Sequence, residues 1–175
     1  QNEQILDSIR YAERIQSAIL SPEKDLSNSL SEYFILFRPR DIVSGDYYWT
    51  SRKGDRLLIA VADCTGHGVP GAFLSVMGIT AMNEIVGRND SLHAGQILEH
   101  LRTYVVQALH QTGDRYEARD GIEIALCIID LKKKNIEFAG ANRPLYLFRK
   151  AGNSQAKAED FELTQIRGDK QPVGA

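Results

Sequence analysis

Residues 44–69 read SGDYYWTSRKGDRLLIAVADCTGHGV, and this stretch decides the fold. The turn signal KGD at residues 53–55 separates two strand-like runs, so the stretch predicts a β-hairpin. Asp46 and Asp63 then fall at neighbouring strand ends, and a glycine-rich loop directly follows Asp63. Two carboxylates beside such a loop suit a hard divalent cation, with room left for water and a phosphate.

The composition is that of an ordinary globular domain. The chain has 175 residues, of which 43% are hydrophobic and 25% charged, and its net charge is −2. This balance gives no electrostatic basis for nucleic acid binding. No apolar run is long enough to cross a membrane, and no signal peptide is visible. We therefore expect a cytoplasmic domain that contacts neither nucleic acid nor a membrane.

Apolar periodicity outside the hairpin predicts the remaining elements. A helical stripe covers residues 3–20 and ends at Ser21-Pro22, and two longer helices begin at Pro70 and after Ser91. The expected strands cover residues 33–37, 42–50, 56–63, 122–129, 135–139, 145–148 and 162–166, with a turn at 152–154. Sequential hairpins imply mainly antiparallel sheet with the helix pair on one face, which is an α+β layered sandwich.

Each candidate residue also has a purely structural interpretation. Asp46 could be an acid at a strand start that bonds a turn amide. Asp63 ends an apolar strand, where an ionised carboxylate is costly unless it is paired or bound to a cation. His67 could donate a proton or hold a phosphate, or could bond the backbone of its loop. Arg143 could bind a phosphate bidentately or lie in solvent. The two aspartates together favour a metal site.

Four motifs occur in order along the chain: SGDYYW, VADCTGHGVPGAFLSVMG, DGIEIALCIIDL and AGANRPLYL. Together they resemble the SpoIIE-type protein serine/threonine phosphatases, a bacterial branch of the metal-dependent type 2C (PPM) phosphatases. The resemblance implies a layered αββα-type sandwich with two Mn²⁺ or Mg²⁺ ions at one edge. It also implies direct attack of a metal-activated water on phosphoserine or phosphothreonine, without a phosphoenzyme.

The resemblance assigns roles to individual residues. Asp63 would bridge the two metal ions, Cys64 would lend its backbone carbonyl, and Asp46 would be the second acidic ligand. The glycines of the loop, which let backbone groups approach a ligand closely, and Arg143 are the candidate contacts of the substrate phosphate. The candidate site residues are, in chain order, Asp46, Asp63, Cys64, Gly66, His67, Gly68 and Arg143.

The helices are the expected route of regulation. The two long helices would match the pair that moves to switch the site on in this branch, and residues 1–21 would match a linker helix through which upstream domains act within a homodimer. The phosphatase domain would cover residues 32–175, and its substrate would be a phosphoserine protein, for example one of the anti-sigma-factor-antagonist type. The candidate regulatory residues are Pro70, Phe73, Met77, Leu98 and Leu101.

One departure from the family concerns the metal ligands. The family supplies further aspartates from later segments, and neither occurs before Ala175. We therefore expect the C-terminal part of the fold to be missing, half of the metal site to be present, and the chain alone to show little activity. Two other functions stay open, namely a catalytically silent PPM-like binding module and, more remotely, an ATP-binding domain of the histidine-kinase type.

Overall fold

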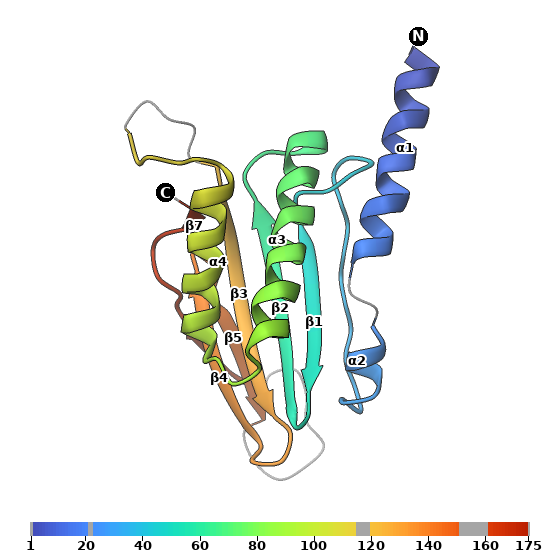
Figure 1. Ribbon diagram of the computed structural model, residues 1–175. Helices are drawn as coiled ribbons and strands as arrows, with labels where there is room; N and C mark the ends of the chain where they lie inside the picture. Colours follow the sequence, from blue (N-terminus) through green and yellow to red (C-terminus); the bar gives the residue numbers. More distant parts are fainter. Residues whose placement is uncertain (1, 21–22, 115–119, 151–160, 175) are drawn as a thin grey trace.

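The computed structural model describes residues 2–20, 23–114, 120–150 and 161–174. Helices and strands follow in the order expected for an α+β domain (Figure 1). The helices are α1 (Asn2–Ile19), α2 (Lys24–Ser27), α3 (Gly68–Arg88) and α4 (Ala94–Ala108). The strands are β1 (Tyr47–Lys53), β2 (Arg56–Cys64), β3 (Gly121–Asp130), β4 (Asn135–Ala141), β5 (Leu145–Lys150), β6 (Phe161–Ile166) and β7 (Val173–Gly174).

One antiparallel sheet is the centre of the described structure. Its strands lie in the order β1-β2-β3-β4, and the short β7 pairs with the first residues of β3. Strands β5 and β6 form a separate two-stranded sheet in the same described part of the chain. Helices α3 and α4 lie side by side across one face of the main sheet (Figure 1). The α+β class and the helix pair on one face, both predicted from the sequence, are thus confirmed.

The hydrophobic core lies between the two helices and the sheet. Alternate residues of β1, β2 and β3 point toward the helices, as the two-residue period of a strand requires. Helix α3 comes closest at Gly78, where a Cβ atom would lie 2.6 Å from the Tyr47 hydroxyl. Trp49 donates its indole N–H to the Asn83 side chain at 2.8 Å. The residues that β1, β2 and β3 contribute to this core are Tyr47, Trp49, Leu58, Ala60, Ala62, Cys64, Ile122, Ile124, Leu126 and Ile128.

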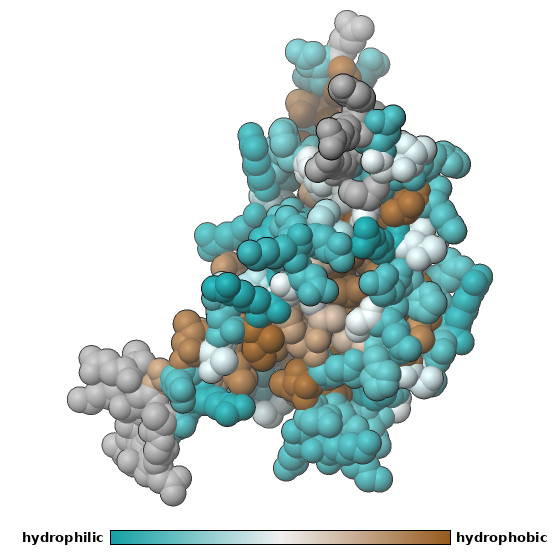
Figure 2. Space-filling view, turned by 90° about the vertical axis from the view of Figure 1, so that its left-hand side faces the viewer, coloured by the Kyte–Doolittle hydropathy of each residue, from teal (hydrophilic) through white to brown (hydrophobic). Residues whose placement is uncertain are grey.

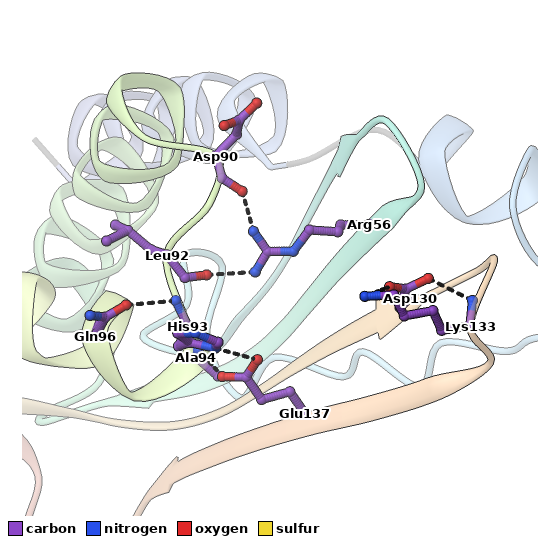
Figure 3. Close-up of polar contacts among 9 residues, drawn as sticks. All are labelled: Arg56, Asp90, Leu92, His93, Ala94, Gln96, Asp130, Lys133 and Glu137. Atoms are coloured by element: carbon purple, nitrogen blue, oxygen red, sulfur yellow. Dashed lines mark hydrogen bonds and ion pairs between the residues drawn. The ribbon is translucent and has the colours of Figure 1, made fainter.

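The connection between α3 and α4 is attached to the end of the sheet opposite Asp63 (Figure 3). The Arg56 guanidinium, at the start of β2, donates to the carbonyl oxygens of Asp90 and Leu92. Glu137 of β4 accepts the backbone N–H of Ala94 at 2.6 Å and contacts His93 Nδ1 at 3.1 Å. A carboxylate at a helix N-terminus satisfies a free N–H and interacts favourably with the helix dipole. The helix pair is therefore tied to the sheet at this end.

Three predicted elements differ from the structure. Residues 33–37 form no strand, and Phe34 and Leu36 are exposed, because no neighbouring strand pairs with them among the described residues. Strand β1 begins at Tyr47 rather than at residue 42. The apolar spacing of α3 is buried only in part, since Phe73 is 73% exposed whereas Ala81 is fully buried. The predicted helix stop at residues 21–22 and the turn at 152–154 lie outside the described residues.

Helix α3 also has the length and hydropathy of a membrane span, with a mean hydropathy of 1.4. Half of that window is buried. The buried side packs on the sheet, with Ile79 and Met82 fully covered. This is the behaviour of a core helix in a folded domain.

The other face of the main sheet is open in the described structure. A nearly all-apolar strand such as β2 is typical of cover on both faces, yet Val61 is 60% exposed. Side chains of this face line a groove of about 840 Å³ that ends at Asp46, Asp63 and Arg143. Apolar residues of β5 and β6 are exposed as well, including Phe148 and Leu163. Figure 2 shows hydrophobic residues gathered in the lower half of the side seen there, among hydrophilic ones.

Candidate active site

The β1–β2 hairpin brings Asp46 and Asp63 together, as the sequence predicted. Tyr47 pairs with Ala62 in the antiparallel register, so the residue before Tyr47 lies opposite the residue after Ala62. Burial raises the pKa of Asp46, the adjacent Asp63 carboxyl group raises it further, and the positive charge of Arg143 lowers it. These effects on the pKa are expected when two carboxyl groups lie close together.

Tight backbone packing fixes the loops that carry the two acids. The Asp46 N–H donates to the Ser44 hydroxyl at 3.0 Å, and the Cys64 N–H donates to the Gly45 carbonyl at 3.3 Å. A Cβ atom on Gly45 would lie only 3.0 Å from the Gly66 carbonyl oxygen. Any larger residue at position 45 would push the two loops apart. The glycine of the SGD motif therefore sets the separation of the two carboxylates.

Arg143 reaches the same place from the turn after β4. Its Nη2 atom contacts the Asp63 carboxylate and lies 2.8 Å from Glu123 Oε2. Its Nε atom is buried and has no hydrogen-bond partner among the described residues. The Arg143 side chain also lines the groove. This position agrees with the predicted phosphate contact, which itself stays a prediction.

The acids and a backbone carbonyl form a donor set that fits a hard cation in part. Mg²⁺ and similar ions prefer carboxylate and carbonyl oxygens. Burial, with the nearby charges of Asp63 and Asp46, raises the pKa of Cys64 to about 12. Its thiol is therefore neutral, and the oxygen of its carbonyl, not its sulfur, is the candidate ligand. No group of three or more His, Cys, Asp or Glu side chains suited to a metal occurs in the described residues.

The remaining loop residues lie at the start of α3. Gly66 and Gly68 have φ angles of +86° and +61°, a conformation that favours glycine. His67 is the N-terminal flanking residue of α3, and its Nδ1 atom lies 3.0 Å from the Asp41 carboxylate. Asp41 was not predicted as a partner. A role of His67 in proton donation stays a prediction.

The candidate regulatory residues divide between the surface and the core. Leu98 and Leu101 of α4 are buried, and Met77 is partly buried against the core. Pro70 and Phe73 are exposed near the N-terminal end of α3. The two groups therefore lie on different sides of the helix pair. Their part in regulation stays a prediction.

Sequence reasoning gave no role to Glu123 or Gln16. Glu123 lies directly opposite Asp63 in the β2–β3 register, and this pairing becomes visible only once the register is known. Gln16 is buried and donates to the Ser44 carbonyl at 2.6 Å. A polar residue inside the apolar stripe of a helix is the sequence signal that could have identified it.

Comparisons with known proteins define the class of this domain. The family model for Stage II sporulation protein E (SpoIIE) matches residues 53–164. The PP2C domain of SiaA from Pseudomonas aeruginosa is 31% identical, with a TM-score of 0.78 over 99% of this chain. A Stage II sporulation E family protein from Thermanaerovibrio acidaminovorans is 17% identical, covering 61% of this chain and 50% of its own, with a TM-score of 0.47. No curated protein gave a significant sequence match.

These findings identify a phosphatase-type domain with a PP2C-like α+β fold. The chain belongs to the SpoIIE family. It spans 64% of the length of the SiaA chain that it matches. The family resemblance stated from the four motifs is therefore confirmed. PP2C-like proteins are generally metal-dependent, which agrees with the oxygen donors at the end of the hairpin.

Proposed function

We propose that the chain is part of a protein phosphatase that hydrolyses phosphoserine or phosphothreonine on a partner protein. The observation that carries the proposal is the pairing of Asp46 with Asp63 at the end of the hairpin. Two acids side by side cost free energy unless a cation neutralises them. Membership of the SpoIIE family supports the same function.

Asp46, Asp63 and the carbonyl of Cys64 would hold Mn²⁺ or Mg²⁺, two ions in the complete site. Such ions lower the pKa of a water molecule and neutralise charge on the phosphoryl group. Arg143 and the N–H groups of the glycine loop would orient the phosphate. His67 is our candidate proton donor to the leaving serine oxygen.

The partners are further proposals. Family membership supports a phosphoserine protein in the cytoplasm as the substrate, for example one of the anti-sigma-factor-antagonist type. Helix α1 supports a homodimer, because apolar side chains along it, such as Tyr11 and Ile15, are exposed. An apolar stripe without cover is a common contact surface for a second helix.

The test measures phosphate release from a phosphoserine protein and from p-nitrophenyl phosphate by the full-length protein. We expect release in Mn²⁺, loss of release in EDTA, and loss in the Asp63→Asn variant. Asp55→Asn, in the exposed turn at the other end of the hairpin, is the matched control and should stay active. Full activity of Asp63→Asn at saturating Mn²⁺ would contradict the proposal. Binding of the phosphoprotein without hydrolysis would instead support the silent binding module.

A further inference from the structure

Two acids lie directly opposite each other at the groove end of the sheet. Asp63 of β2 pairs with Glu123 of β3 in the antiparallel register, so their side chains share one face. Both side chains are partly exposed, at 47% and 38%. Like charges directly opposite on neighbouring strands are destabilising. The sheet therefore needs a cation at this position.

Arg143 supplies that cation in the metal-free protein. Its Nη2 atom lies between the two acids and contacts both. Because Asp63 is a proposed metal ligand, the guanidinium occupies space beside an oxygen that a metal ion would use. Two cations at one carboxylate oxygen repel each other strongly at such short separation.

The turn that carries Arg143 is held independently of Asp63. The Asn142 side-chain amide donates to Glu123 Oε1 at 3.1 Å, and the Asn142 N–H donates to the Asp169 carbonyl at 2.8 Å. Asn142 has a φ angle of +56°, in the left-handed region that asparagine tolerates better than most residues. Glu123 thus binds both residues of the turn. Loss of the Asp63 contact would leave Arg143 anchored.

We propose that Arg143 is the internal counter-ion of Asp63, that a divalent cation displaces it from Asp63, and that Glu123 retains it beside the site. This inference rests on the proposed function, because it takes Asp63 as a metal ligand. Glu123 is then a positioning residue that acts through Arg143. Arg143 lines the groove, so its displaced Nη2 group can donate to a phosphate oxygen there. Metal binding and phosphate recognition are thereby coupled.

The experiment measures Mn²⁺ affinity by electron paramagnetic resonance of free Mn²⁺, on the full-length protein and without substrate. We expect Arg143→Gln to bind Mn²⁺ about five- to tenfold more tightly, because the competing cation is gone. Arg149→Gln, on β5 and outside the groove lining, removes the same charge and should change the affinity less than about twofold. Circular dichroism checks that each variant is folded.

A double-mutant cycle tests the role of Glu123. Removing a negative charge weakens Mn²⁺ binding in any background. If Glu123 retains the guanidinium, Glu123→Gln has a second effect, because Arg143 then pairs with Asp63 alone and competes more strongly with Mn²⁺. We therefore expect Glu123→Gln to weaken Mn²⁺ binding more when Arg143 is present than in the Arg143→Gln background. Equal weakening in both backgrounds would remove Glu123 from the proposal.

The outcomes separate this inference from the proposed function. If the wild type binds Mn²⁺ and Arg143→Gln binds it equally or more weakly, the counter-ion inference is wrong while the metal site stands. If neither protein binds Mn²⁺, both are wrong. Thermal unfolding gives a second readout: Arg143→Gln should lower the melting temperature in EDTA, and saturating Mn²⁺ should remove most of that difference. If Arg143→Gln lowers the melting temperature equally with and without Mn²⁺, the role of Arg143 is purely structural.

Discussion

Gln16 of α1 forms hydrogen bonds with both backbone groups of Ser44, two residues before Asp46. Its Nε2 atom donates to the Ser44 carbonyl at 2.6 Å, and its Oε1 atom accepts the Ser44 N–H at 2.9 Å. The same Nε2 atom donates to the Ser75 hydroxyl of α3 at 2.8 Å. One buried amide therefore joins the N-terminal helix, the loop before Asp46 and the helix that follows the glycine loop.

We expect Gln16→Ala to lower the free energy of unfolding by about 1 to 3 kcal/mol, because it leaves the buried N–H of Ser44 without its acceptor. The Ser44 carbonyl keeps the Ser75 hydroxyl as a donor. Urea denaturation measures the change. Ser17→Ala, the exposed neighbour on the same helix, should change stability by less than about 0.5 kcal/mol. An equally small effect of Gln16→Ala would mean that the contact contributes nothing to the fold.

Gly78 should not tolerate a side chain. A Cβ atom there would lie 2.6 Å from the Tyr47 hydroxyl and 2.9 Å from Ile122 Cδ1. We expect Gly78→Ala to destabilise the protein by about 1 to 3 kcal/mol through overpacking. Gly87→Ala, on the same helix in open space, should instead stabilise it by about 0.5 to 1 kcal/mol.

A second substitution identifies the cause of the Gly78 effect. The Tyr47 hydroxyl is buried and has no partner among the described residues. Tyr47→Phe should therefore recover part of the stability lost in Gly78→Ala, since it removes the atom in conflict. Thermal unfolding of the two single variants and the double variant measures the coupling free energy between positions 47 and 78. If the stability losses of the single variants are strictly additive, the Tyr47 hydroxyl is not the cause, and helix α3 has moved as a whole.

The sequence predicted those features that depend on neighbours in the chain. The hairpin of β1 and β2, and with it the pairing of Asp46 with Asp63, follows from a short turn between two strands. The order of the elements and the helix pair also follow from local periodicity. The strand predicted at residues 33–37 is absent because strand formation needs a pairing partner, which a local pattern does not reveal.

Features that depend on distant contacts were not predictable. Glu123 became part of the site through the register of β2 and β3, 60 positions along the chain from Asp63. The partner of Gln16 lies on a loop 28 residues away. Phe73 and Ala81 share one apolar spacing on α3, yet Phe73 is 73% exposed and Ala81 is fully buried. In each case the outcome depends on tertiary packing, which the local sequence does not determine.

The pairing of Asp46 with Asp63 predicts a pH dependence in metal-free protein. The pKa of Asp46 is raised above its ordinary value of 3.8 by burial and by Asp63. Such a group favours the folded state below its ordinary pKa, and this contribution is lost as the pH rises through the raised folded pKa. In EDTA, Asp46→Asn should therefore raise the urea midpoint at pH 7, and the gain should shrink as the pH falls toward 4. If Asp46→Asn raises the urea midpoint equally at all pH values, the raised pKa of Asp46 is wrong.

Helix α1 should mediate association with a second copy of the protein. Its exposed apolar residues include Ile5 at 56% and Ile15 at 47%. Replacing Ile5 and Ile15 by glutamate puts charges in an apolar contact, so we expect the dimer population to fall at least about tenfold in sedimentation equilibrium. Ser17→Glu adds a charge to the same helix outside the stripe and should leave the dimer intact. If Val61→Glu, on the open face of the sheet, dissociates the dimer while the α1 variants do not, association runs through the groove instead.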